Sequence, residues 1–468
     1  MNLHDLTIKQ IKSAFSDREI SSLELTNLYI ERIKKLEPNL NSFVTTSFEK
    51  AIEMAKEADL KIKEGVDLPL LGVPIAIKDN FCIKDIRTTA SSFVLEDFVP
   101  VYNSTVAEKL INAGAVILGK TNMDAWAHGS STETSDFGAT HNPWDLGKLP
   151  GGSSGGSGAA VAADECLASI GSETAGSIRQ PSSWCGIVGL KPTYGRVSRF
   201  GVVAMGSSLD SPGPMTKTVE DSALILEVLA GHDPKDATTS SETVKKYSDL
   251  IKSKKIMTIG IADDYFVNVD PEIVSKVNQA LDLLKKMGHK IKTIKLFEPK
   301  YAIYVYTILQ RGEVSSNLAR FDGIRYGFGR DRFGQEAKRR IMLGTYILSS
   351  GFYDAYYKKA QKVRTLIIND FKKAFENVDV IIGPTTPSVA LPVGSSKNHP
   401  MFGETADILV EPSSIAGLCG INMPVGFSKN NLPIGMQIIG NQFNEETILN
   451  LAYQYEKETN WREFKPKL

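Results

Sequence analysis

The sequence predicts an α/β fold, with a large, mixed and twisted β-sheet covered by helices on both faces. Apolar runs of strand length alternate along the chain with segments whose apolar residues recur at helical spacing. Strand-like segments occur in the first half of the chain and again near its end, where they can join the first sheet. The composition, 42% apolar and 23% charged residues, is that of a chain that buries a large core. We therefore expect residues 1–468 to form a single domain.

The first 65 residues, 1–65, are expected to be mainly helical. Ser21 and Glu24 have the spacing of a capping box, in which each side chain accepts a hydrogen bond from the backbone of the other residue. Apolar residues at near-helical spacing follow up to Pro38, which predicts a helix over 22–36. A second helical pattern covers residues 51–58.

Residues 66–240 are expected to form the core that carries the reactive loops. The apolar run 70–77 predicts a short buried strand, which places Lys78 at the C-terminal end of a strand. Further elements are expected in the order helix 105–112, strand 115–118, Gly/Ser loop 150–158, helix 158–164 and strand 167–170.

The second half of the chain combines a helical region with late strands. Helical spacing over 274–284 stops at Gly288 and is followed by a β-like segment over 291–296. Residues 298–376 have a mostly helical pattern and are expected to be an insertion. Further strands are expected over 378–383, 421–426 and 433–440.

Charge and cysteine usage exclude several classes of function. The 54 basic and 54 acidic residues cancel, so the chain has no net positive charge to attract nucleic acid or an anionic membrane. The four cysteines are far apart and lack CxxC spacing, which argues against a disulfide framework or a zinc site. The N-terminus has no secretory signal pattern, and no apolar run reaches about 18 residues. We expect a soluble, cytoplasmic protein with reduced thiols; the sequence does not exclude an organelle.

Three segments carry the candidate chemistry: 73–80 (VPIAIKDN), 150–158 (PGGSSGGSG) and 171–181 (GSETAGSIRQP). The second could be a flexible linker, but strand-like and helix-like segments flank it closely. It could also bind phosphate, but no Gly-Lys-Ser/Thr ends it to place a lysine on the phosphates. The glycines therefore indicate a backbone that passes close to another group.

A tight turn at the end of the third segment would point successive backbone N–H groups into one concavity. Such a concavity is an oxyanion hole, which stabilises the negative charge that develops when a nucleophile attacks a carbonyl group. Ser177, at the end of the turn, is the candidate nucleophile. The residues whose N–H groups would form the hole are Thr174, Ala175, Gly176 and Ser177.

A serine nucleophile needs a base, and the sequence favours lysine over histidine in this role. His128 and His141 flank the glycine-rich region, where most such residues make structural hydrogen bonds. The other histidines lie in polar stretches and are expected at the surface: His4, His232, His289 and His399. Burial disfavours the charged form of lysine and lowers its pKa towards neutrality, which suits Lys78 after its apolar strand.

Taken together, the three segments resemble the amidase signature family. The resemblance implies the amidase-signature fold and a triad of Lys78 as base, Ser153 as proton relay and Ser177 as nucleophile, with the Gly152–Ser153 peptide bond in the cis form. It also implies that the N–H groups of residues 174–177 form the oxyanion hole.

The nucleophile loop of the family usually reads Asp-Thr-Gly-Gly-Ser, whereas Glu173 and Ala175 replace the first and third residues here. A positive φ at Ala175 would be strained.

Longer stretches are similar to the glutamine-hydrolysing branch of this family, whose members are subunits of tRNA-dependent amidotransferases. The stretches are 118–124 (LGKTNMD), 129–133 (GSSTE), 142–145 (NPWD), 177–181 (SIRQP), 189–199 (GLKPTYGRVSR) and 338–346 (KRRIMLGTY). The resemblance implies that Tyr306, Arg340 and Asp407 bind the α-amino and α-carboxylate groups of glutamine, with residues 298–376 contributing to the pocket.

The same resemblance implies partners and cofactors outside this chain. Ammonia released from glutamine would pass to a B subunit, which binds ATP and Mg²⁺ and amidates Glu-tRNA(Gln), while a small C subunit holds the two together. The chain itself is expected to hold no metal or cofactor. Two alternatives remain open from the sequence: a stand-alone amidase for another small amide, and a catalytically silent scaffold subunit.

Overall fold

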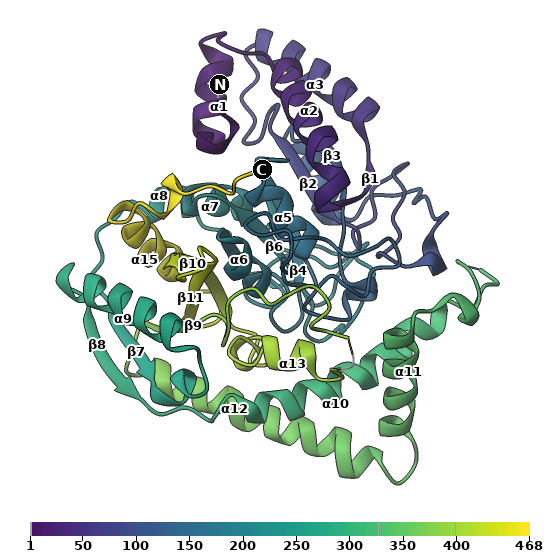
Figure 1. Cartoon of the computed structure of the whole chain (residues 1–468), viewed down its shortest axis with the longest axis vertical. Helices are drawn as coiled ribbons and strands as arrows, with labels where there is room; N and C mark the ends of the chain where they lie inside the picture. Colours follow the sequence, from purple (N-terminus) through teal and green to yellow (C-terminus); the bar gives the residue numbers. More distant parts are fainter. Residues whose placement is uncertain (1, 326, 398) are drawn as a thin grey trace.

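A single mixed β-sheet runs through the computed structural model, which describes residues 2–325, 327–397 and 399–468 (Figure 1). In the described part of the chain the sheet has eleven strands in the order β1-β3-β2-β4-β6-β5-β10-β11-β9-β7-β8. The strands are β1 (Phe43–Thr46), β2 (Pro74–Lys78), β3 (Val116–Thr121), β4 (Ala168–Glu173), β5 (Val188–Lys191), β6 (Ser211–Thr216), β7 (Thr258–Ala262), β8 (Lys290–Ile294), β9 (Val380–Pro384), β10 (Cys419–Phe427) and β11 (Pro433–Gly440).

The sheet has two parallel groups of three strands, separated by antiparallel strands, and the edge strand β1 is antiparallel to β3. β2 is parallel to both β3 and β4, and β7 is parallel to both β8 and β9. The intervening strands pair in antiparallel fashion, and β10 joins β5 to β11. The late strands therefore share one sheet with the early strands, and the predicted α/β class with a mixed sheet is confirmed.

Helices surround the sheet, with α1 to α3 at the top of the view and α10 to α12 at the bottom (Figure 1). The α-helices are α1 (Ile8–Ser16), α2 (Ser22–Leu40), α3 (Phe48–Lys63), α4 (Thr105–Asn112), α5 (Gly155–Ala162), α6 (Arg179–Cys185), α7 (Val219–Leu229), α8 (Tyr247–Leu250), α9 (Pro271–Lys286), α10 (Lys300–Asn317), α11 (Gln335–Leu348), α12 (Lys359–Phe375), α13 (Phe402–Ala406), α14 (Glu411–Ile415) and α15 (Glu445–Lys457). A π-helix, Tyr353–Lys358, precedes α12, and short 3-10 turns occur at Leu3–Asp5, Phe93–Leu95, Ala125–Ala127, Asp263–Phe266, Leu318–Arg320, Arg330–Arg332 and Trp461–Glu463.

Apolar residues fill both sides of the sheet. On β9, Val380 and Ile382 belong to a large core that includes residues of α7, α9 and α15. Ile381, between them, belongs to a second core that includes residues of α10 and α12. Since side chains of a strand alternate between its two faces, the helices cover both faces at this position.

Several local predictions need correction. The first long helix does not stop before Pro38 but runs to Leu40, because Leu40 is buried and Pro38 lies in the exposed last turn. The predicted Gly/Ser loop over 150–158 becomes helical at Gly155, where α5 begins. A Cβ at Gly156 would lie 2.4 Å from the carbonyl oxygen of Ser42, so the small residues allow α5 to pack closely against its neighbours.

Two histidines expected at the surface are in fact shielded from it. His289 is 3% exposed, and its Nδ1 accepts a hydrogen bond from the N–H of Met257. His4 is half-buried and forms a 3.4 Å contact with Asp164. The four cysteines are free, as predicted, and all four are buried. Among the described helices, none is both long and apolar enough to cross a membrane.

The crossing of α10 and α11 depends on Gly344. A Cβ at this position would lie 1.9 Å from the carbonyl oxygen of Arg311 on α10. Replacing Gly344 with any larger residue must therefore push the two helices apart.

We expect Gly344→Ala to lower the free energy of unfolding by about 1–3 kcal/mol, the usual cost of overpacking. Denaturant unfolding followed by circular dichroism would measure it. Gly383→Ala is the matched control: a Cβ added to this buried strand residue would have its nearest neighbouring atom at 3.5 Å, and the residue has no positive φ. Its stability should be unchanged or raised by up to about 1 kcal/mol. Equal losses in the two variants would contradict the prediction.

Candidate active site

The three segments singled out in the sequence meet at one edge of the sheet. Lys78 is the last residue of β2, and Ser172 lies near the end of β4, the parallel neighbour of β2. Ser153 lies in the loop that leads into α5, and its preceding peptide bond, Gly152–Ser153, is cis as the family resemblance predicts. The carboxyl ends of parallel neighbours lie at the same sheet edge, which brings these residues together.

Lys78 is completely buried and has three hydrogen-bonding neighbours. Its Nζ lies 2.7 Å from Ser153 Oγ and 3.1 Å from both the carbonyl oxygen and the Oγ of Ser172. Burial lowers the pKa of Lys78 to about 7, although Asp124, Asp210 and Glu173 act in the opposite direction. Near neutral pH a large fraction of this lysine is therefore uncharged.

The neighbours of Lys78 fit an uncharged amine, which has two N–H groups and one lone pair. The carbonyl oxygen of Ser172 can only accept, and Ser172 Oγ also receives a 2.9 Å hydrogen bond from the Asn80 amide. If the two N–H groups of Lys78 point to these oxygens, its lone pair faces Ser153 Oγ. The Ser153 hydroxyl is then placed to give its proton to Lys78.

The turn from 173 to 179 is held by a buried ion pair. Glu173 Oε1 accepts from Arg179 Nε at 3.0 Å and from Arg179 Nη2 at 2.6 Å. Glu173 Oε2 accepts from the backbone N–H groups of Ile178 and Arg179 at 3.1 and 3.0 Å. The remaining donors of Arg179 reach Ser413, Ser414, Gln437 and the carbonyl oxygen of Val410.

This arrangement leaves backbone donors free beside Ser177. Within the described part of the chain, the N–H groups of Ala175, Gly176 and Ser177 donate to no protein acceptor. The Thr174 hydroxyl donates to Asp210 Oδ1 at 2.6 Å, which fixes the start of the turn. Ala175 has no positive φ, so the alanine at this position is not strained.

Ser177 is 4% exposed, and the loop of Ser153 lies beside it. The N–H of Ser154 donates to the carbonyl oxygen of Ser177 at 3.3 Å. No hydrogen bond joins the hydroxyls of Ser153 and Ser177 directly among the contacts of these two described residues.

The three predicted substrate-binding residues come from the helical side of the site. Tyr306 lies on α10, Arg340 on α11 and Asp407 directly after α13, and their exposed fractions are 5%, 4% and 3%. Asp407 borders the nucleophile turn, because a Cβ added to Gly176 would lie 2.5 Å from Asp407 Oδ1. Arg340 and Asp407 both lie within electrostatic range of Tyr306, so the three belong to one neighbourhood.

Polar atoms without a partner are concentrated in this neighbourhood. Buried polar atoms normally have hydrogen-bond partners, so a group of unpaired ones indicates a place for a ligand or water. The unpaired atoms are Asp407 Oδ1, Arg340 Nη1, both carboxylate oxygens of Glu411, both ring nitrogens of His128, Arg311 Nε and Gln310 Nε2. His128 thus departs from the expectation that it makes structural hydrogen bonds.

Several residues of the site were not predicted from the sequence. Ser172 and Asn80 lie within the predicted motifs 171–181 and 73–80, so they could have been found there as neighbours of the base. Arg311, Glu404 and Glu411 carried no such signal, because ordinary charged residues on helices are usually solvated. Among the described residues, no group of three or more His, Cys, Asp or Glu side chains could hold a metal ion.

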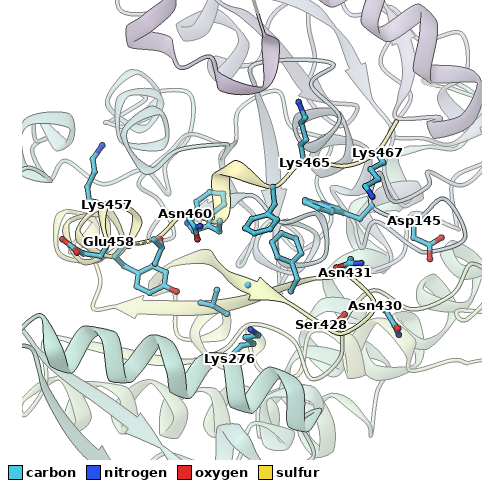
Figure 2. Close-up of a pocket in the computed structure, with 18 residues that line it drawn as sticks. Asp145, Lys276, Ser428, Asn430, Asn431, Lys457, Glu458, Asn460, Lys465 and Lys467 are labelled. Carbon is cyan, nitrogen blue, oxygen red and sulfur yellow. Dashed lines mark hydrogen bonds between the residues drawn. The ribbon is translucent and has the colours of Figure 1, made fainter.

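A large groove elsewhere on the surface is distinct from this site (Figure 2). It has a volume of about 1130 Å³ and lies between the end of β10 and the C-terminal residues. Its aromatic side chains include Trp144, Phe427 and Phe464, with ring centroids 4.8 and 5.0 Å apart in successive pairs. The residues that line it include none of the predicted catalytic or substrate-binding residues.

Known proteins resemble the chain over nearly its whole length. The family model described as Amidase matches residues 24–449. The A subunit of the glutamyl-tRNA(Gln) amidotransferase of Thermoanaerobacter pseudethanolicus is 50% identical, over 98% of this chain and 97% of the relative. The crystal structure of the protein of the same name from Thermotoga maritima has a TM-score of 0.81 and 37% identity, covering 98% of this chain and 96% of that one. A 6-aminohexanoate cyclic dimer hydrolase has a TM-score of 0.90 and 25% identity, covering 100% and 99%.

We expect Arg179→Met to lower the free energy of unfolding by about 3–5 kcal/mol, because it leaves the buried Glu173 carboxylate without its partner. Thermal or denaturant unfolding would measure the loss. Arg332→Met is the matched control: it breaks an exposed pair with Glu96, whose N–O distance is 2.8 Å, and should cost about 0–1 kcal/mol. Similar small losses in both variants would show that the buried pair does not hold the turn.

Proposed function

The chain belongs to the amidase family, and we propose that it is the glutamine-hydrolysing subunit of a glutamyl-tRNA(Gln) amidotransferase. The observation that carries the chemistry is the contact of 2.7 Å between Lys78 Nζ and Ser153 Oγ, beside a turn with free backbone donors. The observation that supports the substrate is the buried set of Tyr306, Arg340 and Asp407 next to that turn.

The proposed reaction begins with proton transfer. Neutral Lys78 takes the proton of Ser153, which in turn takes the proton of Ser177 as Ser177 Oγ attacks the side-chain carbonyl carbon of glutamine. The attack forms a tetrahedral anion. The proton held by Lys78 then returns through Ser153 to the amide nitrogen, the C–N bond breaks, and ammonia leaves.

The second half of the reaction releases glutamate. Water attacks the acyl-serine ester and gives a proton to the same relay; the C–O bond to Ser177 then breaks as the relay returns this proton to Ser177 Oγ, which restores neutral Lys78. In both halves the negative oxygen would be stabilised by the N–H groups of residues 174–177. Free donors at Ala175, Gly176 and Ser177 support this role, and no cofactor takes part in these steps.

Recognition of glutamine is assigned to the helical side of the site. The guanidinium of Arg340 would bind the α-carboxylate, for which its planar donors are suited. The free Nη1 of Arg340 and the free Oδ1 of Asp407 support this assignment, with Asp407 binding the α-ammonium group. Tyr306, on α10, would line the pocket beside them.

We further propose that ammonia leaves for a partner protein in the cytoplasm. In this assignment a B subunit holds ATP and Mg²⁺ and amidates Glu-tRNA(Gln), and a small C subunit completes a heterotrimer. The names of the relatives, each one part of a tRNA-dependent amidotransferase, support an assembly of several chains. The balanced charge of this chain agrees with contact to tRNA mainly through the B subunit.

A stand-alone amidase is the second candidate. Its support is the close structural similarity to a 6-aminohexanoate cyclic dimer hydrolase, with a TM-score of 0.90. The higher sequence identity of the amidotransferase subunits, 50% against 25%, favours the first assignment.

The pH dependence of glutamine hydrolysis tests the role of Lys78. Because only the neutral amine can accept a proton, we expect kcat/KM to rise with pH through about 7, the pKa of Lys78. Lys78→Arg should lose about 10²- to 10⁴-fold in kcat, as Lys78→Ala should, since a guanidinium stays charged. A folded Lys78→Arg variant with substantial activity, or a rate that falls with pH through 7, would contradict the role.

Labelling with an electrophilic glutamine analogue tests the nucleophile and the function together. Mass spectrometry of the trapped complex should find the adduct on Ser177, and Ser177→Ala should abolish both the adduct and glutaminase activity. Ser154→Ala, next to the relay, is the control and should still be labelled at Ser177. Glutaminase activity that survives in the complex with Ser177→Ala would instead support a catalytically silent scaffold.

The same preparations distinguish the two enzymatic candidates. Hydrolysis that rises strongly when the B and C subunits are added supports the amidotransferase assignment. Rapid hydrolysis of unrelated small amides without partners supports the stand-alone amidase.

A further inference from the structure

Three acidic side chains lie close together in the segment that contains α13 and α14. Glu404, Asp407 and Glu411 are three and four residues apart, the spacing of neighbours on a helix. The N–H of Glu411 donates to the carbonyl oxygen of Asp407 at 3.0 Å, so the two acids lie one turn apart. Their exposed fractions are 2%, 3% and 0%. Burying carboxylates is costly unless donors or cations compensate them.

The three acids differ in how they are compensated. Glu404 pairs with Arg311 at 2.5 Å. Asp407 accepts from Ser130 Oγ at 2.7 Å through Oδ2, while its Oδ1 has no donor. Neither oxygen of Glu411 has a donor among the residues that the structure describes, although Glu411 is completely buried. Three carboxylate oxygens on neighbouring turns are therefore unpaired.

The nearby arginines do not serve as partners of Glu411. Arg311 donates to Glu404, and Arg340 donates to Glu336 at 2.6 Å. Burial raises the pKa of Glu411 well above its usual range, and negative charge on Asp407 and Glu404 adds to this effect. Glu411 is thus not part of a structural ion pair among the described residues, and its position does not stabilise the free protein.

One of the unpaired oxygens, Asp407 Oδ1, lies beside the reactive turn. A Cβ on Gly176 would come within 2.5 Å of Asp407 Oδ1 and within 2.5 Å of Val410, the residue before Glu411. α14 also packs against α10, which carries Tyr306, and Glu411 lies within electrostatic range of that tyrosine. Asp407 therefore borders the reactive turn, and Glu411 lies near both Asp407 and Tyr306.

We propose that Glu411 is a second carboxylate for the α-ammonium group of the substrate, beside Asp407. This inference rests on the proposed function. An ammonium group has three N–H donors, and the two acids offer three unpaired oxygens, so one bound ammonium would pair with all of them. Its positive charge would also compensate the ionised carboxylates that the free pocket disfavours.

The consequence is selectivity for amides that carry an amino group. A substrate without an ammonium group leaves Asp407 Oδ1 and both Glu411 oxygens unpaired in a buried pocket, which weakens its binding. Glu411 would then act on substrate affinity and not on the chemical step at Ser177.

The test compares the binding of glutamine with that of glutaramate, which is glutamine without its α-amino group. Calorimetry on the assembled complex carrying Ser177→Ala measures both affinities without hydrolysis. We expect Glu411→Gln to weaken glutamine by at least about tenfold and glutaramate by less than about twofold. In the enzyme with Ser177 present, KM for glutamine should rise while kcat changes little.

Two further variants guard against a purely structural explanation. Glu411→Leu should show the same substrate difference without a lower melting temperature, because an apolar residue replaces an unpaired buried acid. Glu165→Gln changes another completely buried glutamate, which contacts Ser42, and should leave both affinities unchanged.

Equal effects of Glu411→Gln on the two ligands, or no effect on either, would overturn the role of Glu411 while glutamine binding itself supports the proposed function. If the complex that retains Glu411 does not bind glutamine or glutaramate and does not hydrolyse either one, both the proposed function and this inference are overturned.

Discussion

Arg179 donates to Glu173 inside the turn that carries Ser177, and neither side chain reaches solvent. The second oxygen of Glu173 takes the N–H groups of the two residues after Ser177, so the turn closes on its own carboxylate. Arg179 also donates to Ser413 on α14 and to Gln437 on β11, which connects the turn to both elements. Because the carboxylate satisfies those later N–H groups, the earlier ones at 175–177 remain free for a ligand oxygen. A buried pair of this kind contributes little net stability but fixes one conformation of the turn.

The buried base and the unpaired backbone donors lie at the same edge of the sheet. Lys78 ends β2 under the loops that follow β4, so desolvation removes its charge without any nearby cation. Ser172 occupies two of the lysine's hydrogen-bonding positions and leaves Ser153 at the third. The helical side of the site carries charged groups of both signs: Arg340 and Arg311 lie near three buried acids. Reaction and recognition are thus divided between the sheet edge and the helices α10, α11, α13 and α14.

The amino-acid sequence was sufficient to predict the parts of the site that depend on short, continuous segments. An apolar strand followed by a lysine, and two glycine- and serine-rich turns, already indicated which residues would meet. Strand β6 was missed because Pro212 and Pro214 argue against a central strand, yet it pairs with both β4 and β5. Glu411 and His128 could not be identified either. Their importance lies in burial without partners, which depends on how distant helices pack and leaves no trace in the local pattern.

The central claim is that Lys78 is uncharged at neutral pH and lies next to Ser153. Nuclear magnetic resonance of protein labelled with ¹³C at the lysine Cε, with the signal assigned through Lys78→Arg, measures this directly. We expect the Lys78 signal to titrate with a pKa of about 7, far below the ordinary lysine value of 10.5. A Lys78 signal that titrates near that ordinary value would contradict the account.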